Sequence, residues 1–483
     1  MRCGLFFFLL SLFAPLVSAA PPNIIIVLCD DLGYGDLGCY GHEIIKTPRI
    51  DAFARESVMF TNCYSAAPNC SPARTGLMTG RTPWRVGVTN WIPFMSPMHV
   101  RESEITIATL LRDGGYSTCH AGKWHLNGLF NLPGQPQPDD HGFDHWFATQ
   151  NNALPNHKNP YNFVRNDIPV GPLEGYAGPI VIDEAVSWLR EGRDKEKPFF
   201  QFICFHEPHE PIATDPKYEN LYKEFPDPAQ RAHHGNITQM DDAFGTLLDA
   251  LDELELRKDT IVFFTSDNGP AITGMHPYGS SGALRDKKGA IYEGGIRVPG
   301  IVRWPGVIDA GTVLDEPVSA LDILPTLCDI TGIAAPADRP LDGTSLLPLL
   351  HGDSLVREKP LYWHFNRAKS EVKVAIRMDS WKLTARQTGP QFNRGADILE
   401  EEQAAQRVAE LTGFELYNLV RDPAETTDMK EAEADRFESM KQTLETMYKE
   451  VREESPVWPA WEWPRYEGQR IEWPEYWINR KKK

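Results

Sequence analysis

Near its N-terminus the chain reads Asn23-Ile24-Ile25-Ile26-Val27-Leu28-Cys29-Asp30-Asp31. After Asn23 this stretch is apolar and mostly β-branched up to Cys29, which is typical of a strand buried on both faces. Similar runs at 198–205 and 260–265 predict two more buried strands. Between these two runs, residues 236–256 have the apolar periodicity of an amphipathic helix. Strands that alternate with helices predict an open α/β sheet.

Polar side chains follow each predicted strand at the point where it ends. Ligands of an open α/β sheet collect beyond the carboxyl ends of its strands, so the pattern predicts one site assembled from distant segments. Each pair taken alone is also typical of an ordinary loop or helix cap. The residues are Asp30 and Asp31, Lys123 and His125 after the short segment 116–120, His206 and His209, and Asp267 and Asn268.

A second informative stretch is Asn69-Cys70-Ser71-Pro72-Ala73-Arg74-Thr75-Gly76-Leu77-Met78-Thr79-Gly80. Ser71 is predicted to cap a helix that begins just after Cys70 and ends near Gly80, with Pro72 at its first position. The free amide groups of that helix end face Cys70, and Arg74 adds a cation. The thiol therefore lies where an anion would be held, and the alternative is an ordinary buried cysteine. The preceding segment 47–60 is predicted to be an amphipathic helix.

Composition limits the classes of protein to which the chain can belong. The 483 residues are 41% hydrophobic and 24% charged, which suits one large core plus a smaller domain. A net charge of −18 disfavours non-specific binding to nucleic acid or to anionic membranes, so we expect no nucleic-acid partner. An anionic substrate would have to be attracted by a few cations within a cleft.

The first 20 residues are predicted to be a signal peptide. A basic start at Met1-Arg2, an apolar run over 5–17 and the small residues Val17-Ser18-Ala19-Ala20 predict export to the periplasm or the medium after cleavage. We find no later stretch of transmembrane length. The cysteines lack zinc-binding spacing, and Cys29, Cys119 and Cys204 are predicted to be buried thiols, while any disulfide pairing stays open.

The sequence Cys70-Ser71-Pro72-Ala73-Arg74, followed by Leu77, Thr79 and Gly80, resembles the signature of the type I, formylglycine-dependent sulfatases. These arylsulfatase-like enzymes belong to the alkaline phosphatase superfamily, and most have Ser where this chain has Ala73. The resemblance extends over nearly the whole mature chain. Further matching segments are Asp30-Asp31, Gly122-Lys123-Trp124-His125-Leu126, the His-x-Pro-like loop at His209, Ser266-Asp267-Asn268-Gly269, and 284–299 with Lys288.

The resemblance implies an alkaline-phosphatase-like fold. We expect a large mixed, mainly parallel sheet flanked by helices over residues 21–355, and a smaller antiparallel α+β subdomain over 356–483. Strand-like runs at 361–364, 372–378, 381–385 and 414–418, with helical segments at 398–411 and 429–453, agree with such a subdomain. The Trp- and Pro-rich tail, 458–477, is expected to pack over the body, and the alternative is that its aromatic rings border a sugar cleft.

The resemblance also implies a mechanism and a cofactor. Cys70 would be oxidised to formylglycine by a formylglycine-generating enzyme or a radical maturase, and its hydrate would attack sulfur to give a covalent sulfo-enzyme. One Ca²⁺, with Mg²⁺ less suited, would assist the attack. The metal ligands would be Asp30, Asp31, Asp267, Asn268 and the modified Cys70. Lys123, Lys288 and Arg74 would neutralise the sulfate, His209 would protonate the leaving oxygen, and His125 would take the proton that releases sulfate. We expect Asp36 to be solvated.

A long polar segment at 135–165 favours a sulfated carbohydrate as the substrate. Its candidate sugar contacts are Asn151, Asn152, His157, Lys158 and Asn162, although such residues are also typical of a solvated loop. The predicted function is the hydrolysis of sulfate monoesters on such a carbohydrate. The alternatives are a phosphonate or phosphodiester hydrolase of the same superfamily, and an inactive carbohydrate-binding relative.

Overall fold

The computed structural model describes residues 21–391, 395–465 and 467–481, and within them the largest element is an 11-stranded sheet. Its strands are β1 (Asn23–Asp30), β2 (Val58–Tyr64), β3 (Ser117–Lys123), β4 (His145–Thr149), β5 (Val164–Arg165), β6 (Ile168–Pro169), β7 (Phe199–Pro208), β8 (Thr260–Ser266), β9 (Arg297–Arg303), β10 (Thr312–Leu314) and β11 (Val318–Ser319). Their order is β10-β2-β9-β8-β1-β7-β3-β4-β5-β6, with β11 paired to β2. The central strands β8, β1, β7, β3 and β4 run parallel, which confirms the expected mixed, mainly parallel sheet.

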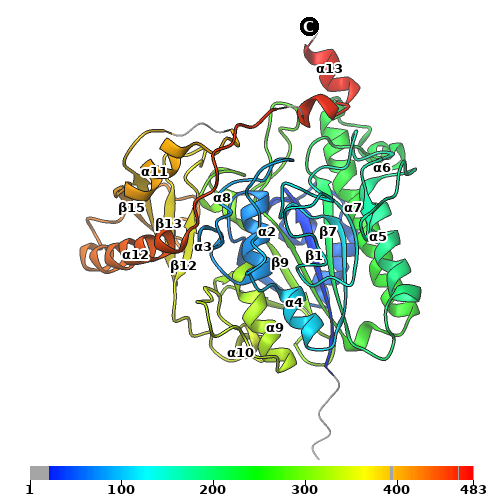
Figure 1. Cartoon of the computed structure of the whole chain (residues 1–483), viewed down its shortest axis with the longest axis horizontal. Helices are drawn as coiled ribbons and strands as arrows, with labels where there is room; N and C mark the ends of the chain where they lie inside the picture. Colours follow the sequence, from blue (N-terminus) through cyan, green and yellow to red (C-terminus); the bar gives the residue numbers. More distant parts are fainter. Residues whose placement is uncertain (1–20, 392–394, 466, 482–483) are drawn as a thin grey trace, which may run out of the picture.

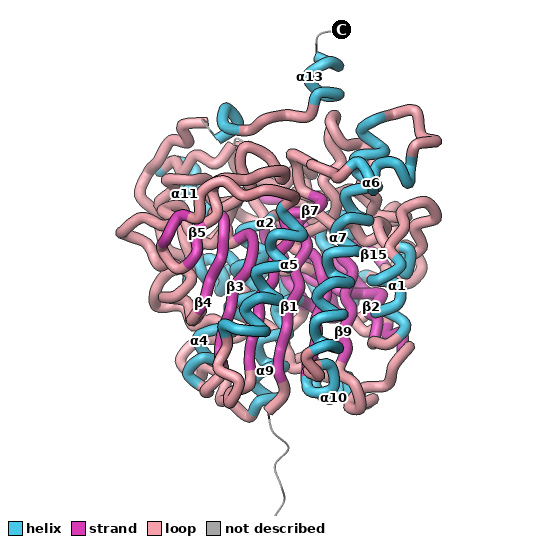
Figure 2. The backbone as a smooth tube through the Cα atoms, turned by 90° about the vertical axis from the view of Figure 1, so that its right-hand side faces the viewer, coloured by secondary structure: helices cyan, strands magenta, loops and turns pink. Residues whose placement is uncertain are grey.

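Helices cover both faces of this sheet, and strand β1 shows why. Ile24, Ile26 and Leu28 belong to one apolar core, while Ile25 and Val27 belong to another on the opposite face, because successive side chains of a strand alternate. The first core includes α2 (Cys70–Thr79), α4 (Ile107–Asp113) and α9 (Ile323–Thr331). The second includes α1 (Pro48–Arg55), α5 (Ala177–Ser187) and α7 (Pro228–Glu253). Figure 2 shows α5 and α7 in front of the strands.

A second, four-stranded antiparallel sheet lies in the C-terminal part, as expected. Its strands are β12 (Leu361–His364), β13 (Val374–Met378), β14 (Trp381–Gln387) and β15 (Leu411–Asn418), with helices α11 (Glu400–Val408) and α12 (Ala434–Glu454) beside them (Figure 1). Met440 and Leu444 of α12 pack against one face. Trp363 and Tyr417 on the sheet pack against Tyr64 of the larger part. The division after residue 355 stays a prediction.

Shorter helices connect these layers. They are α3 (Pro83–Val86), α6 (Pro216–Glu219), α8 (Glu293–Ile296), α10 (Leu347–Leu350) and α13 (Glu475–Lys481). Single 3₁₀ turns lie at Gly38–Tyr40, Asn220–Tyr222, Arg257–Asp259, Ala320–Asp322 and Glu467–Arg470, and a π turn lies at Trp188–Gly192. Among the described residues, every helix is too short or too polar to span a bilayer. The predicted signal peptide at 1–20 lies outside the described residues.

Two predicted helices have different bounds in the structure. The helix expected over 47–60 ends at Arg55, and Val58, Met59 and Phe60 instead pair with β9, because burial in the sheet outweighs the local helical pattern. Helix α7 begins at Pro228 rather than near 236, since the Asp227 side chain caps the backbone N–H of Ala229. Cys29, Cys119 and Cys204 are buried free thiols, as predicted.

Candidate active site

The strand ends bring the predicted polar residues to one edge of the sheet. Strands β8, β1, β7 and β3 are consecutive parallel neighbours, so their carboxyl ends meet. Asp267 follows β8, Asp30 ends β1, His209 follows β7 and Lys123 ends β3. Parallel pairing thereby places side chains side by side that lie up to 237 positions apart in the sequence.

Cys70 is the first residue of helix α2, at the same edge. The cap is Asn69, whose side chain accepts a hydrogen bond from the Cys70 N–H at 2.9 Å, so the prediction that Ser71 caps the helix is wrong. The Ser71 hydroxyl instead accepts from the backbone N–H of Ile92 at 3.1 Å. This tie fixes the loop that follows the helix against its N-terminal turn.

The Cys70 thiol is buried among charged groups. Lys288 Nζ donates to its Sγ at 3.3 Å, and Asp30 Oδ1 lies 3.7 Å from the same sulfur. Burial raises the pKa of the thiol to about 12, although the positive charges of Lys123 and Lys288 act in the opposite direction. The thiolate is the reactive form of cysteine, so an unmodified thiol at this position is a poor nucleophile near neutral pH.

The three carboxylates of the site each have a basic partner. Lys123 Nζ donates to Asp30 Oδ2 at 2.6 Å, and Lys288 Nζ lies 2.6 Å from Asp31 Oδ1. Asp267 Oδ2 accepts from Arg74 Nε at 3.0 Å and from Nη2 at 2.8 Å. Burial alone would raise the pKa of Asp30, but Lys123 and the other nearby positive charges hold it well below its usual value.

Several oxygen atoms at this edge fit a divalent cation. Ligand atoms of Asp30, Asp31, Cys70 and His209 lie within 4.8 Å of one another. Asp31 Oδ2 and Asn268 Oδ1 are buried and, within the described part of the chain, accept no hydrogen bond. Buried oxygens without donors are costly, and carboxylate and amide oxygens are the ligands that Ca²⁺ prefers. The donor set therefore fits Ca²⁺.

Arg74 lies behind the carboxylates. Besides its two hydrogen bonds to Asp267, its Nη1 donates to the backbone carbonyl of Lys123 at 3.0 Å. The side chain is fully buried and is absent from the residues that line the pocket described below. The structure thus gives Arg74 a positioning role for the ends of β3 and β8, in addition to the charge expected beside a sulfate.

The two candidate catalytic histidines have different surroundings. His209 Nε2 lies 3.7 Å from Asp31 Oδ2, and its Nδ1 is hydrogen-bonded to the backbone carbonyl of Glu210. His125 Nε2 donates to the Ile92 carbonyl at 3.1 Å, while its Nδ1 is buried and has no partner among the described residues. Burial lowers the pKa of both imidazoles, that of His209 to about 4. His206, the weaker candidate, is hydrogen-bonded to Thr149 Oγ1 at 2.7 Å.

The site opens into a pocket of about 680 Å³. Cys70, His125, His209 and Lys288 line it together with residues that sequence reasoning singled out as sugar contacts, namely Asn151, Asn152 and Asn162. His157 is buried with its ring 5.4 Å from that of His206, and Lys158 Nζ lies 5.6 Å from the Tyr176 ring centroid. For these last two residues a role in sugar binding stays a prediction.

Other pocket residues come from segments with no recognisable local signal. Lys369 follows β12 and Arg470 belongs to the tail, and only the fold brings them to Cys70. Trp463 and Trp473 also line the pocket, which agrees with the alternative expectation that the tail borders a cleft. Asp36, expected to be solvated, is fully buried and accepts from the N–H groups of Gly33 and Ser280 at 2.7 and 2.8 Å, because it joins two site loops.

Comparisons with known proteins agree with this geometry. The sulfatase family model matches residues 22–333, and the model "N-sulphoglucosamine sulphohydrolase, C-terminal" matches residues 283–394. N-acetylgalactosamine-6-sulfatase of Canis lupus familiaris is 33% identical over 410 residues, which cover 78% of this chain and 75% of the relative. Human arylsulfatase A is 32% identical over 456 residues, which cover 87% and 86%.

A solved structure shows the same architecture. The crystal structure of Ps i-CgsB in complex with k-i-k-neocarrahexaose superimposes with a TM-score of 0.78 at 26% identity, covering 93% of this chain and 96% of that one. The family model spans more than half of the present sequence, and the curated relatives align across both the larger sheet and most of the C-terminal part. The chain therefore belongs to the sulfatase family of the alkaline phosphatase superfamily and is a sulfuric ester hydrolase.

Proposed function

We propose that this sulfatase removes sulfate from a sulfated carbohydrate, with formylglycine made from Cys70 and one bound Ca²⁺. The observation that carries the proposal is the position of Cys70. Its sulfur lies at the floor of the pocket, 3.3 Å from Lys288 Nζ and 3.7 Å from Asp30 Oδ1. That sulfur stands where an oxygen of hydrated formylglycine would lie. The high pKa of the thiol supports the modification, since an unmodified Cys70 would react slowly.

Asp30, Asp31, Asp267 and Asn268 would hold the Ca²⁺, with the modified residue 70 as a further ligand. The cation would favour the deprotonated form of a hydroxyl group at residue 70. Mg²⁺ suits the site less, because it usually keeps several waters rather than filling a set of protein oxygens. Arg74 holds Asp267 in place through two hydrogen bonds.

The remaining site residues would act on the sulfate ester itself. Formylglycine would supply a geminal diol, one hydroxyl of which attacks sulfur while the other later releases the sulfate. Lys123 and Lys288 neutralise the sulfonate oxygens, as expected of cations in a water-excluded site. His209 donates a proton to the leaving sugar oxygen as the sulfur–oxygen bond breaks, and the negative ester favours its protonated form. His125 accepts the proton of the second hydroxyl through its unpartnered Nδ1.

The carbohydrate substrate is supported by the pocket and by the relatives. Asn151 and Asn152 line the pocket, and the side-chain oxygen of each lacks a hydrogen-bond partner within the described ranges, so sugar hydroxyls could donate to them. One relative is an N-acetylgalactosamine-6-sulfatase, and one solved neighbour holds a neocarrahexaose. The volume of about 680 Å³ greatly exceeds the room that a sulfate group needs.

Maturation and export complete the proposal. A formylglycine-generating enzyme or a radical maturase would convert Cys70, reading the Cys-x-Pro-x-Arg pattern of residues 70–74. The basic and apolar start of the chain would direct export to the periplasm or the medium. Mass spectrometry of the peptide that contains residue 70 checks the conversion, and N-terminal sequencing of the exported protein checks cleavage near residue 20.

The decisive experiment compares Cys70→Ala with the wild-type protein. We expect the wild type to hydrolyse an aryl sulfate much faster than an aryl phosphate diester, and Cys70→Ala to lose turnover although it folds. Cys39→Ala, which removes a thiol outside the pocket, is the matched control and should remain active. Faster hydrolysis of the phosphate diester would favour the alternative hydrolase. Full sulfatase activity in a folded Cys70→Ala protein would refute the proposal.

A further inference from the structure

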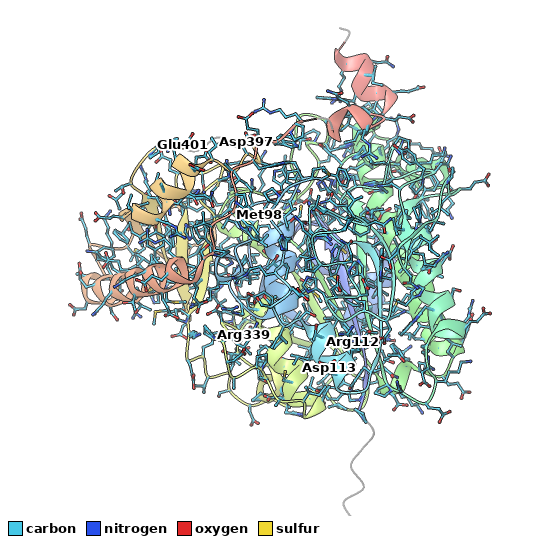
Figure 3. All side chains as sticks on the ribbon, viewed as in Figure 1. Met98, Arg112, Asp113, Arg339, Asp397 and Glu401 are labelled. Atoms are coloured by element: carbon cyan, nitrogen blue, oxygen red, sulfur yellow. The ribbon has the colours of Figure 1, made fainter. Side chains whose placement is uncertain are left out.

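The C-terminal tail crosses the active-site pocket and is attached on both sides of it. We call residues 456–465 and 467–474 the strap; Figure 1 shows it in red between α12 and α13. On the side of the C-terminal sheet, the backbone of Trp461 exchanges two 2.8 Å hydrogen bonds with Ile398, and Trp463 N–H donates to Asp397 at 2.8 Å (Figure 3 labels Asp397). On the side of the larger sheet, Glu472 N–H donates to the Pro155 carbonyl at 2.8 Å.

The strap presents aromatic rings to the pocket. Trp463 and Trp473 line it while remaining half-buried, and Trp463 meets Trp91 edge to face at 5.0 Å between ring centroids. Partly exposed indoles that border a cavity are typical of a ligand site, because large apolar surfaces are otherwise covered. The faces of sugar rings are apolar enough to stack on such indoles. The strap thereby extends the site beyond the region that a single sulfate would occupy.

The charges around the pocket all have one sign. Among the described residues that line it, each Lys, Arg, Asp or Glu side chain is basic, although the whole chain carries a net charge of −18. Lys288 contacts Asp31, and Arg367 contacts Glu402 at 2.6 Å. Two further cations, Lys369 and Arg470, line the same pocket. This concentration of positive charge exceeds what one sulfate needs and favours a more anionic ligand.

The position of Lys369 places one of these cations beside the sulfate-binding region. Its backbone N–H donates to the Gly289 carbonyl at 2.7 Å, and its Cε lies 3.0 Å from where a Cβ on Gly289 would be. Gly289 directly follows Lys288. Arg470 reaches the pocket from the strap, so the two cations come from different segments and can bind groups that lie apart on one ligand.

We propose that the strap makes this pocket a site for an oligosaccharide that bears a second anionic group, which Lys369 and Arg470 bind while Trp463 and Trp473 stack on sugar rings. The second group is a sulfate ester or a carboxylate, since both accept charged hydrogen bonds from Lys and Arg. The inference rests on the proposed function, because it assumes that the ester cleaved at residue 70 belongs to a carbohydrate.

The test compares Arg470→Ala with Arg465→Ala, which removes a strap cation that does not line the pocket. Each variant is assayed on an aryl sulfate and on three oligosaccharides, with one sulfate, with two sulfates, or with one sulfate and one carboxylate. For Arg470→Ala we expect kcat/KM on a doubly anionic substrate, divided by that on the aryl sulfate, to fall about tenfold, mainly through KM. Arg465→Ala should leave this ratio unchanged, and the two doubly anionic substrates distinguish sulfate from carboxylate.

A binding measurement separates this inference from the proposed chemistry. In a Cys70→Ala background, calorimetric titration with the preferred doubly anionic oligosaccharide should show weaker binding after Trp463→Ala or Lys369→Ala, and near-normal binding after Trp463→Phe. An equal effect of Arg470→Ala on all four substrates, or none on any, would overturn the inference while leaving the sulfatase chemistry intact. If the wild-type protein cleaves the aryl sulfate but no oligosaccharide, both the carbohydrate proposal and this inference fail.

Discussion

Arg74 shows how one side chain can serve a charged site without facing its substrate. The guanidinium is fully buried and donates to Asp267 and to the carbonyl of Lys123. It therefore fixes one proposed Ca²⁺ ligand and one proposed sulfate-binding residue at the same time. Burial and the neighbouring charge of Asp30 raise the pKa of Asp267 to about 7, so this carboxylate depends on Arg74 to remain ionised near neutral pH.

Replacing Arg74 by Ala should destabilise the fold strongly. The change leaves Asp267 buried without its partner, and breaking a buried ion pair in this way costs about 3–5 kcal/mol. Urea denaturation measures the loss in the free energy of unfolding. Arg190→Ala is the control, since Arg190 pairs with Glu253 on the surface at 2.9 Å and surface pairs contribute little. Equal denaturation curves for the two variants would contradict the assignment.

Removing the cation should also lower stability at the residues that bind it. Asp31 Oδ2 and Asn268 Oδ1, which have no protein donor within the described segments, would lose their proposed partner. A chelator should therefore lower the melting temperature, and Ca²⁺ at 100 times its Kd should restore about 2.7 kcal/mol. In Asp31→Asn this Ca²⁺-dependent shift should be smaller. Calorimetry with Ca²⁺ and with Mg²⁺ checks the order of preference.

At the level of elements, the site depends on how the strands end. Asp31 follows β1 with φ 68°, and His125 follows β3 with φ 59°. Non-glycine residues seldom adopt positive φ, and such positions collect at functional sites. Gly122, with φ 109°, lies so close to β7 that a Cβ would be 1.8 Å from the Cys204 carbonyl oxygen. This close approach aligns Lys123 with Asp30.

Gly122→Ala should therefore reduce both stability and activity. The methyl group would push β3 away from β7 and move Lys123 and His125. Gly115→Ala is the matched control, because Gly115 also has positive φ (92°) but nothing lies within 4 Å of its Cβ position. It should cost only the backbone strain of about 1–2 kcal/mol and leave kcat/KM unchanged. Thermal unfolding and aryl sulfate kinetics compare the two, and similar losses in both would argue against steric contact as the cause.

On the scale of the whole molecule, the pocket lies between the larger sheet and the C-terminal part. Buried Lys382 of β14 joins them, with its Nζ 3.0 Å from Glu293 and 2.8 Å from Glu425. The strap makes a second connection across the pocket. Both connections hold residues from distant parts of the chain at fixed positions around Cys70, so the substrate site requires the two parts to be docked.

Buried histidines should make the fold sensitive to acid, and His141 isolates the effect. It is buried, and burial lowers its pKa to about 4, so the unfolded chain takes up the proton first as the pH falls. Its contribution is complete above pH 6.5 and is lost between pH 6.5 and 4. By pH 5 the loss is about 2 kcal/mol. Urea denaturation of His141→Gln at pH 7 and 5 should show a pH-dependent loss smaller by this amount than in the wild type.

Local sequence was sufficient for the elements and for most of the candidate site. The apolar runs of β1, β7 and β8 predicted buried strands, and the polar residues after them predicted the edge at which Asp30, Lys123, His209 and Asp267 meet. These signals are short-range, because burial on both faces requires a continuous apolar run. The end of α1 was predicted wrongly, since the pairing of residues 58–60 with β9, nearly 240 positions away, leaves no local mark.

The sequence by itself determined the kind of chemistry, because a cysteine before a helix, paired carboxylates and isolated cations are visible as residue types and spacings. Only the tertiary structure decided that Asp36 is buried, that Arg74 holds Asp267, and that Lys369 and the strap border the pocket. The physical reason is that these properties depend on contacts between segments far apart in the chain. Burial, pKa and pocket shape are set by what packs around a residue, and that is known only once the sheets and the tail have docked.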